Sequence, residues 1–258
     1  NISGSGTATW GTGNITSSPL FCGASSGDYT LAENSPCVGT GESGANMGAL
    51  GVVCGSMVDD TYWGPFYVSV DGSDAAGDGS EDSPFATIQA GIDASIGGDT
   101  VLVGPGTYGE TITFLGKQIV VMSTGGAAST VIYSTANNVS FNDQEGSGAV
   151  LRGFTLSGNG SDSGVKADHY ASPVLQDLVI YNQGQAVKLG ISSNISLINV
   201  TLSDNDYGIY MSNSGNVTLT NSIIWSSDNS PIYLGDNGAQ ISISYSDILG
   251  GEANIGGV

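Results

Sequence analysis

Basic residues are the scarcest feature of this 258-residue sequence, which has four lysines and arginines against 24 aspartates and glutamates. The formal net charge of −20 repels nucleic acids and anionic membrane surfaces, so we expect no nucleic-acid partner. Long apolar runs are also missing. Because a membrane helix needs about 20 consecutive apolar residues, we expect no membrane insertion.

Cysteine is almost as rare, and the three cysteines all lie in the first fifth of the chain, at Cys22, Cys37 and Cys54. In a secreted protein, one disulfide among them would leave one thiol over. The pairing stays open, and three reduced, buried cysteines are the alternative.

Asn-x-Ser/Thr sequons are frequent, although a chain rich in Asn, Ser and Thr also produces them by chance. Besides the one at Asn1, the glycosylation candidates are Asn14, Asn138, Asn159, Asn194, Asn199 and Asn216. Together with the cysteines they fit an extracellular or cell-surface location.

Glycine is abundant, with 41 residues, and short aliphatic segments recur between the glycines and small polar residues. From residue 151 onward one pattern returns five times, as LRGFTL, LQDLVI, LINVTL, LTNSII and ISYSDI. Its first residues follow one another at steps of 24, 22, 22 and 24, and the sixth residue is always aliphatic. The first residues are Leu151, Leu175, Leu197, Leu219 and Ile243; the sixth are Leu156, Ile180, Leu202, Ile224 and Ile248.

Two further strand patterns complete each repeat. One lies between the repeats, in GVKA, AVKL, GIYM and PIYL, where Val165, Val187, Ile209 and Ile232 align. The other runs into the repeat's first residue, as in NISL, NVTL and QISI. Alternating aliphatic residues indicate strands with one buried face. Three short strands every 22 to 24 residues predict an all-β fold, a parallel β-helix whose stacked coils bury aliphatic columns.

One helix is expected, near residues 84–94. Ser83 suits the N-cap and Pro84 the first helical position, and Phe85, Ile88 and Ile92 form an apolar stripe at helical spacing. Because the exposed end of a solenoid needs a cover, we interpret this helix as the lid over the first coil.

Residues 67–123, which begin YVSVDGSDAAGDGSEDSPFATIQ and end LGKQIVVMS, resemble the N-terminal part of pectate-lyase-like right-handed β-helix proteins. The resemblance extends more loosely through the coils to Ile248. It implies the right-handed β-helix fold and secretion. It does not imply one activity, because the superfamily includes lyases, hydrolases, adhesins and surface proteins.

The first 54 residues resemble the segment that follows the last coil in such proteins, although here they precede the first. Read from the C-terminus into the N-terminus, the chain gives one uninterrupted terminal coil. We therefore expect a circularly permuted unit: residues 1–54 complete the β-helix of the preceding copy, residues 55–66 form a linker, and residues 67–258 form the capped β-helix. The copies are periods of a tandem array or separate subunits that join head to tail; an arbitrary fragment of a surface protein is the alternative.

A catalytic set is not evident, and the sequence favours a protein that is not an enzyme. A calcium-dependent lyase would need clustered carboxylates and a base, but Arg152 has only Asp177 near it on the expected coils. A glycoside hydrolase would need two carboxylates roughly 5 to 9.5 Å apart, which Asp204 and Asp206 satisfy loosely. The single histidine, His169, stands beside Asp168 in what reads as a surface turn.

A calcium loop is the best candidate for a bound ion. Asp71, Asp74, Asp78 and Glu81 lie within a glycine-rich stretch, and calcium favours oxygen-rich, flexible loops. Such an ion would be structural, tying the lid to the first coil. The alternative is a solvated turn that leads to the helix, and no other cofactor is expected.

Assembly is therefore the expected function: a structural subunit of an extracellular filament or surface array, with copies of itself as partners. The alternative is a carbohydrate-binding adhesin or a polysaccharide lyase or hydrolase. Its nearest support is a set of aromatic residues beside acidic ones, Tyr181, Tyr207, Tyr210 and Trp225, with Tyr210 and Tyr233 aligned one coil apart.

Overall fold

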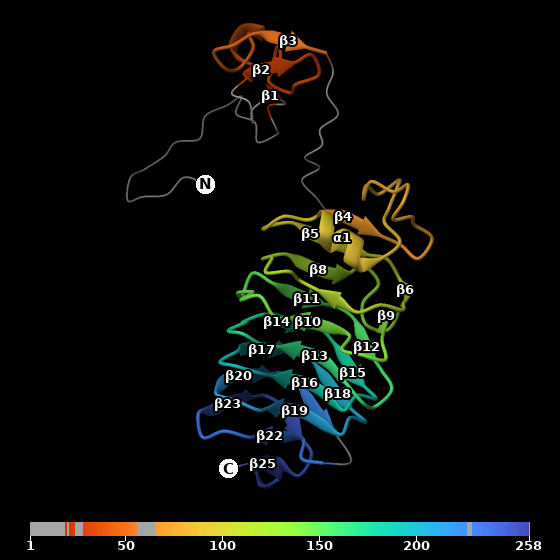
Figure 1. The fold of residues 1–258 in the computed structure, drawn as a ribbon, viewed down its shortest axis with the longest axis vertical. Helices are drawn as coiled ribbons and strands as arrows, with labels where there is room; N and C mark the ends of the chain where they lie inside the picture. The colour runs from red at the N-terminus through yellow and green to blue at the C-terminus, as the bar shows by residue number, and fades with distance from the viewer. Residues whose placement is uncertain (1–18, 20, 24–27, 56–64, 226–228, 258) are drawn as a thin grey trace. The chain divides into compact units, whose positions relative to one another are not determined.

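The structure, a computed structural model, describes residues 19, 21–23, 28–55, 65–225 and 229–257 (Figure 1). The chain divides into two compact units, Asn1–Trp63 and Gly64–Val258, which we call the N-terminal unit and the β-helical unit. The linker predicted at residues 55–66 falls mostly outside the described residues.

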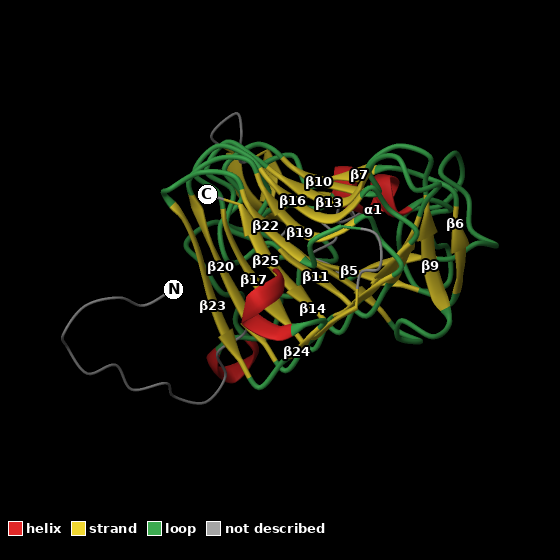
Figure 2. Ribbon diagram, turned by 90° about the horizontal axis from the view of Figure 1, so that it is seen from below, coloured by secondary structure: helices red, strands yellow, loops and turns green. Residues whose placement is uncertain are grey.

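The β-helical unit consists of three parallel sheets, and the chain passes through them in the same order in each successive coil (Figures 1 and 2). Sheet 1 contains β4 (Phe66–Val68), β5 (Thr100–Val103), β8 (Val120–Ser123), β11 (Val150–Arg152), β14 (Val174–Gln176), β17 (Asn194–Ile198), β20 (Gly215–Thr220) and β23 (Ala239–Ser244). Sheet 2 contains β6 (Gly106–Tyr108), β9 (Thr130–Tyr133), β12 (Thr155–Ser157), β15 (Val179–Tyr181), β18 (Thr201–Ser203), β21 (Ile223–Trp225) and β24 (Asp247–Ile248). Sheet 3 contains β7 (Ile112–Thr113), β10 (Val139–Phe141), β13 (Ser163–Ala167), β16 (Gln185–Leu189), β19 (Tyr207–Met211), β22 (Ile232–Leu234) and β25 (Ile255–Gly257).

The registers confirm the predicted columns. Leu151, Leu175, Leu197, Leu219 and Ile243 pair in turn across sheet 1. The sixth residues of the repeat pair in the same way across sheet 2, and Val165, Val187, Ile209 and Ile232 pair across sheet 3. Because each strand alternates its side chains, these columns point into the solenoid and form one continuous core.

The turn between sheet 1 and sheet 2 explains why the repeat has a small or polar residue at its third position. That residue adopts a positive φ in five successive coils, and Gly, Asn and Asp tolerate this left-handed conformation best. The residues are Gly153, Asp177, Asn199, Asn221 and Tyr245. A bulky residue takes this position only in the last coil.

The predicted lid is present as α1, but it is shorter than expected, Ile88–Ala94, with Thr87 as its N-cap. The predicted start at Pro84 is wrong because the backbone of Phe85 bonds instead to Tyr67 and Ser69, beside β4. The helix buries Ile88 and Ile92 completely. A Cβ on Gly91 would lie 2.8 Å from Val101 Cγ1, so only glycine allows this close approach to the first coil.

Charged side chains hold both ends of α1. Glu110 accepts hydrogen bonds from the backbone N–H groups of Ile88 (2.8 Å) and Gln89 (3.0 Å). Lys117 Nζ donates to the carbonyl oxygens of Ile92 and Asp93 at 2.7 and 3.0 Å. An anion at the N-terminus and a cation at the C-terminus complement the helix dipole, so the lid is fixed on the first coil.

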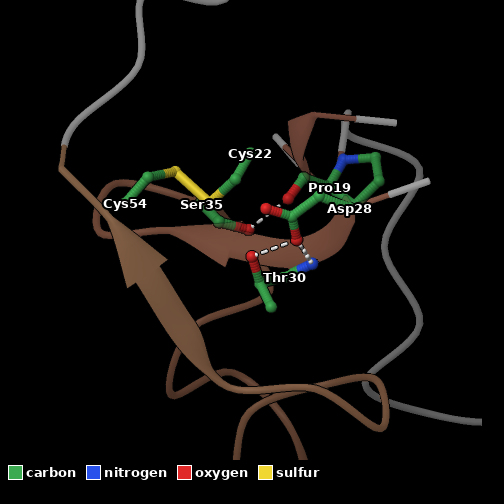
Figure 3. The surroundings of a disulfide bond; sticks show 6 residues. All are labelled: Pro19, Cys22, Asp28, Thr30, Ser35 and Cys54. Carbon is green, nitrogen blue, oxygen red and sulfur yellow. Dashed lines mark hydrogen bonds between the residues drawn. A yellow bond between two sulfur atoms is a disulfide. The ribbon is translucent and has the colours of Figure 1, made fainter. Parts of the chain in front are cut away.

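The N-terminal unit is a three-stranded sheet in the order β1 (Phe21–Gly23), β2 (Asp28–Ala32) and β3 (Val52–Cys54), with the 3-10 turn η2 (Glu42–Gly44). A disulfide joins Cys22 to Cys54, and Cys37 is a buried free thiol, which settles the pairing that the sequence left open (Figure 3). Ser35 Oγ donates to the carbonyl oxygen of Pro19, and Asp28 accepts from Thr30.

Candidate functional site

The last coil is where the aliphatic columns reach the surface. It comprises β23, β24, the 3-10 turn η3 (Gly251–Asn254) and β25, and we call it the open C-terminal coil. Leu219 is fully buried, whereas Ile243, the next residue of the same column, is 38% exposed. Ile248 and Ile255 are likewise half-buried, while their partners Ile224 and Ile232 are fully buried.

A hollow of about 510 Å³ lies against this coil. Its apolar lining comes from the inward-facing isoleucines of the last coil, and its polar lining includes two acidic residues. The lining residues are Ile241, Ile243, Ser246, Asp247, Ile248, Gly251, Glu252 and Ile255. The hollow therefore lies where one more layer of polypeptide would continue the core.

The two ends of the β-helical unit thus differ. The first coil lies under Ile88 and Ile92 of α1, and both side chains are completely buried. The last coil has exposed aliphatic side chains, together with Tyr245, which is 89% exposed. The strands β23, β24 and β25 are also the end strands of their three sheets, so each presents an edge to which a further strand could add.

A second candidate lies on the outer face of sheet 3, which we call the tyrosine–lysine face. Lys166, Lys188, Tyr210 and Tyr233 follow one another across β13, β16, β19 and β22. The rings of Tyr210 and Tyr233 stack at 4.9 Å, and Tyr207 meets both rings edge-on at 5.2 and 6.0 Å. Two of the four basic residues of the chain thus adjoin a three-ring platform.

The aromatic residues named from the sequence do not gather at one place. Tyr207 and Tyr210 belong to the tyrosine–lysine face, but Tyr181 and Trp225 lie on sheet 2. The sequence did not associate Lys166 and Lys188 with the tyrosines, although the aligned segments GVKA, AVKL, GIYM and PIYL carry that column.

The residues considered for catalysis are engaged in turns and ion pairs. Arg152 Nε donates to Asp177 Oδ2 at 2.9 Å on the surface of sheet 1. Asp168 accepts from the backbone N–H groups of His169 and Ile191. Burial alone would raise the pKa of Asp168, but these hydrogen bonds and the charges of His169 and Lys166 lower it.

The four acidic residues of the predicted calcium loop do not converge. Asp74 accepts from the N–H groups of Ala86 and Thr87 and from Thr87 Oγ1, and Asp78 accepts from the N–H of Ser80. Asp71 and Glu81 are exposed, and across the described part of the chain no three His, Cys, Asp or Glu side chains form a group that could hold a metal ion. Calcium binding by Asp71, Asp74, Asp78 and Glu81 stays a prediction without geometric support.

Asp74 instead ties the loop to the start of the lid, and this contact should depend on pH. Burial opposes the effect, but the hydrogen bonds from Thr87 and Ala86 lower the pKa of Asp74 below 3.8. Its stabilisation is therefore present above pH 3.8 and is lost as the pH falls through the lowered pKa. We expect Asp74→Asn to cost up to about 1 kcal/mol at neutral pH, since the carboxylate is exposed and screened.

Urea unfolding of Asp74→Asn at neutral and acidic pH tests this expectation, with Asp82→Asn as the matched control. The two variants should differ at neutral pH and converge in acid. An equal loss for Asp74→Asn at both pH values would contradict a role for the ionised carboxylate.

The glycosylation candidates separate by burial. Asn159, Asn194, Asn199 and Asn216 are exposed, and Asn14 lies outside the described residues. Asn138 is completely buried, and its Nδ2 donates to the carbonyl oxygens of Ile132 and Ser157, so the folded protein offers no acceptor there. The other sequons stay predictions.

Two further observations concern side-chain amides and membranes. An amide ladder joins Asn216 Nδ2 to Asn194 Oδ1 at 2.6 Å, whereas Asn199 bonds to Asp177 in the previous coil. Among the described residues, no helix is both long and apolar enough to span a lipid bilayer.

Comparison with known proteins identifies the fold. Residues 137–254 match the family model of the right-handed β-helix region. No curated protein matches the chain in sequence. Among solved structures, a rhamnogalacturonan lyase is similar with a TM-score of 0.42 and 13% sequence identity, over 70% of this chain and 74% of that chain.

Proposed function

We propose that this protein, a member of the right-handed β-helix superfamily, is a structural subunit that assembles head to tail through its open C-terminal coil. The observation that carries the proposal is the change along single columns, from Leu219 to Ile243 and from Ile224 to Ile248. Side chains that are fully buried in the inner coils become partly exposed in the last one.

Apolar burial provides the driving force. Covering aliphatic surface is worth about 25 cal/mol per Å², and the exposed strand edges of the three sheets offer backbone hydrogen bonds in addition. A contact between two different surfaces of one molecule repeats from copy to copy and builds a filament unless rotation closes it into a ring. The contacting copies could be separate chains or periods of one array.

An extracellular or cell-surface location is part of this proposal. The Cys22–Cys54 disulfide supports it, because such bonds persist in oxidising compartments. The exposed sequons at Asn159, Asn194, Asn199 and Asn216 are compatible with it.

A charge placed on the open C-terminal coil tests the proposal. Ile243→Glu puts a carboxylate among the isoleucines of the hollow, beside Asp247 and Glu252, and should abolish assembly. The matched control is Ile223→Glu, since Ile223 is similarly exposed but lies on the outer face of sheet 2.

Sedimentation velocity measures the outcome. The wild-type protein and Ile223→Glu should form species that grow with concentration, and Ile243→Glu should stay monomeric. Assembly of Ile243→Glu to the wild-type extent would refute the proposed interface.

Carbohydrate binding is the second candidate, and the tyrosine–lysine face favours it. The stacked rings of Tyr210 and Tyr233 form a flat apolar platform, and the ammonium groups of Lys166 and Lys188 can donate hydrogen bonds to sugar hydroxyls or carboxylates. Lys166 is partly neutralised by Asp168, with 3.7 Å between Nζ and Oδ2.

Binding to a panel of neutral and acidic polysaccharides by affinity electrophoresis tests this second function. The double variant Tyr210→Ala/Tyr233→Ala should lose at least tenfold in affinity, a factor that corresponds to about 1.4 kcal/mol. Tyr181→Ala, on sheet 2, is the control. Equal retardation of both variants by a bound polysaccharide would place its site elsewhere.

A further inference from the structure

The N-terminal unit exposes apolar side chains that its small core does not use. Tyr29 is 53%, Leu50 is 49% and Val53 is 71% exposed. The hydrophobic residues buried in the described part of this unit are Leu31, Ala32 and Cys37. Because scattered apolar residues are normal on a large protein but form a large share of so small a unit, they mark it as a docking element.

The position of Val53 fits docking on a strand edge. It belongs to β3, which is an end strand of the N-terminal sheet, and the following residue, Cys54, is fixed by the disulfide to Cys22. The N-terminal unit thus presents an apolar edge strand held in place covalently. The open C-terminal coil presents apolar side chains and three edge strands.

The connection between the two units favours docking onto another molecule rather than onto the same chain. Cys54 and Phe66 are 12 residues apart, so the connection spans at most about 43 Å when fully extended. Strands β4 and β23 lie at opposite ends of the eight-stranded sheet 1, seven strand spacings or about 34 Å apart. To cover the last coil of its own chain, the N-terminal unit would have to pass beyond β23 on an almost fully stretched connection.

We infer that the open C-terminal coil is covered by the N-terminal unit of a second copy of this chain. This inference rests on the proposed function and deepens it by naming the partner segment. One copy contributes Ile243, Ile248 and Ile255, and the other contributes the apolar surface around Val53. Each copy then retains one free N-terminal unit or one free coil, so the contact propagates.

A mixing experiment with two full-length variants tests the inference. Ile243→Glu blocks the coil and leaves the N-terminal unit intact, whereas Val53→Glu blocks the N-terminal unit and leaves the coil intact. Each variant alone should be monomeric. Their equimolar mixture should form a 1:1 complex of twice the 25.9 kDa chain mass and grow no further. Ala45→Glu, an exposed position of the same unit, is the control and should assemble like the wild type.

The outcomes separate the inference from the proposed function. Assembly by Val53→Glu alone, with Ile243→Glu monomeric, would overturn the role of the N-terminal unit and leave head-to-tail assembly intact. A mixture that stays monomeric would also overturn the inference. A wild-type protein that is monomeric at every concentration would overturn both. Thiol titration should find one free thiol, Cys37, in Val53→Glu, as evidence that its N-terminal unit still folds.

Discussion

Loss of the Cys22–Cys54 disulfide is expected to unfold the N-terminal unit while the β-helical unit stays folded. The bond closes a segment with a sequence separation of 32 residues, for which the chain-entropy estimate of its stabilisation is roughly 3–4 kcal/mol. The hydrophobic residues buried in the described part of this unit are too few to compensate. The β-helical unit contains no cysteine and does not depend on the bond.

Limited proteolysis of Cys22→Ser/Cys54→Ser measures this effect. We expect the N-terminal unit to be cut at least a hundredfold faster than in the wild type, since 3 kcal/mol corresponds to more than a factor of 100. Cys37→Ala is the control that removes a cysteine without removing the bond. Unchanged protection of the N-terminal unit in the double variant would contradict the assignment.

Leu197→Ala is expected to cause the largest loss of stability in the β-helical unit. Leu197 is fully buried and lies in the middle of its column, between Leu175 and Leu219. Removal of a buried leucine side chain costs about 2–5 kcal/mol, and stacked coils on both sides limit how far the cavity can collapse.

Urea denaturation followed by far-UV circular dichroism provides the measurement for Leu197→Ala. The adjacent residue on the same strand, Ser196, points outward and serves as the control, because Ser196→Ala should change the free energy of unfolding by less than about 0.5 kcal/mol. A similar small change in Leu197→Ala would show that the column is not packed as described.

The sequence predicted the coils because their spacing is nearly constant from Leu151 to Ile243. The earlier coils were harder to align. Val101 and Val121 occupy the same column as Leu151, but the step from Val121 to Leu151 is 30 residues. Turns of variable length interrupt the period there without disturbing the register. The resemblance to right-handed β-helix proteins is confirmed for the superfamily and its fold.

Local signals were less reliable where tertiary contacts compete with them. Ser83 and Pro84 are good helix-start residues, yet Phe85 continues a backbone pairing with β4 and delays the helix to Ile88. Likewise, the spacing of Asp71, Asp74, Asp78 and Glu81 suggested an ion, while Asp74 bonds to the backbone at the start of the lid.

The candidate site was only partly visible in the sequence. The alignment contained Ile243 and Ile248, but their exposure depends on whether another layer follows, which a column pattern does not reveal. Ile255 was missed because it lies in a glycine-rich segment without the aliphatic alternation of the inner coils. The pairing of Cys22 with Cys54 needed three-dimensional proximity that three cysteines alone do not specify.

Small-angle X-ray scattering of the wild-type protein over a range of concentrations tests head-to-tail assembly most directly. We predict that the maximum dimension increases with concentration while the cross-sectional radius of gyration stays constant, because copies add at the ends of the β-helix. A maximum dimension that stays constant, or a cross-section that grows with the particle mass, would contradict assembly through the open C-terminal coil.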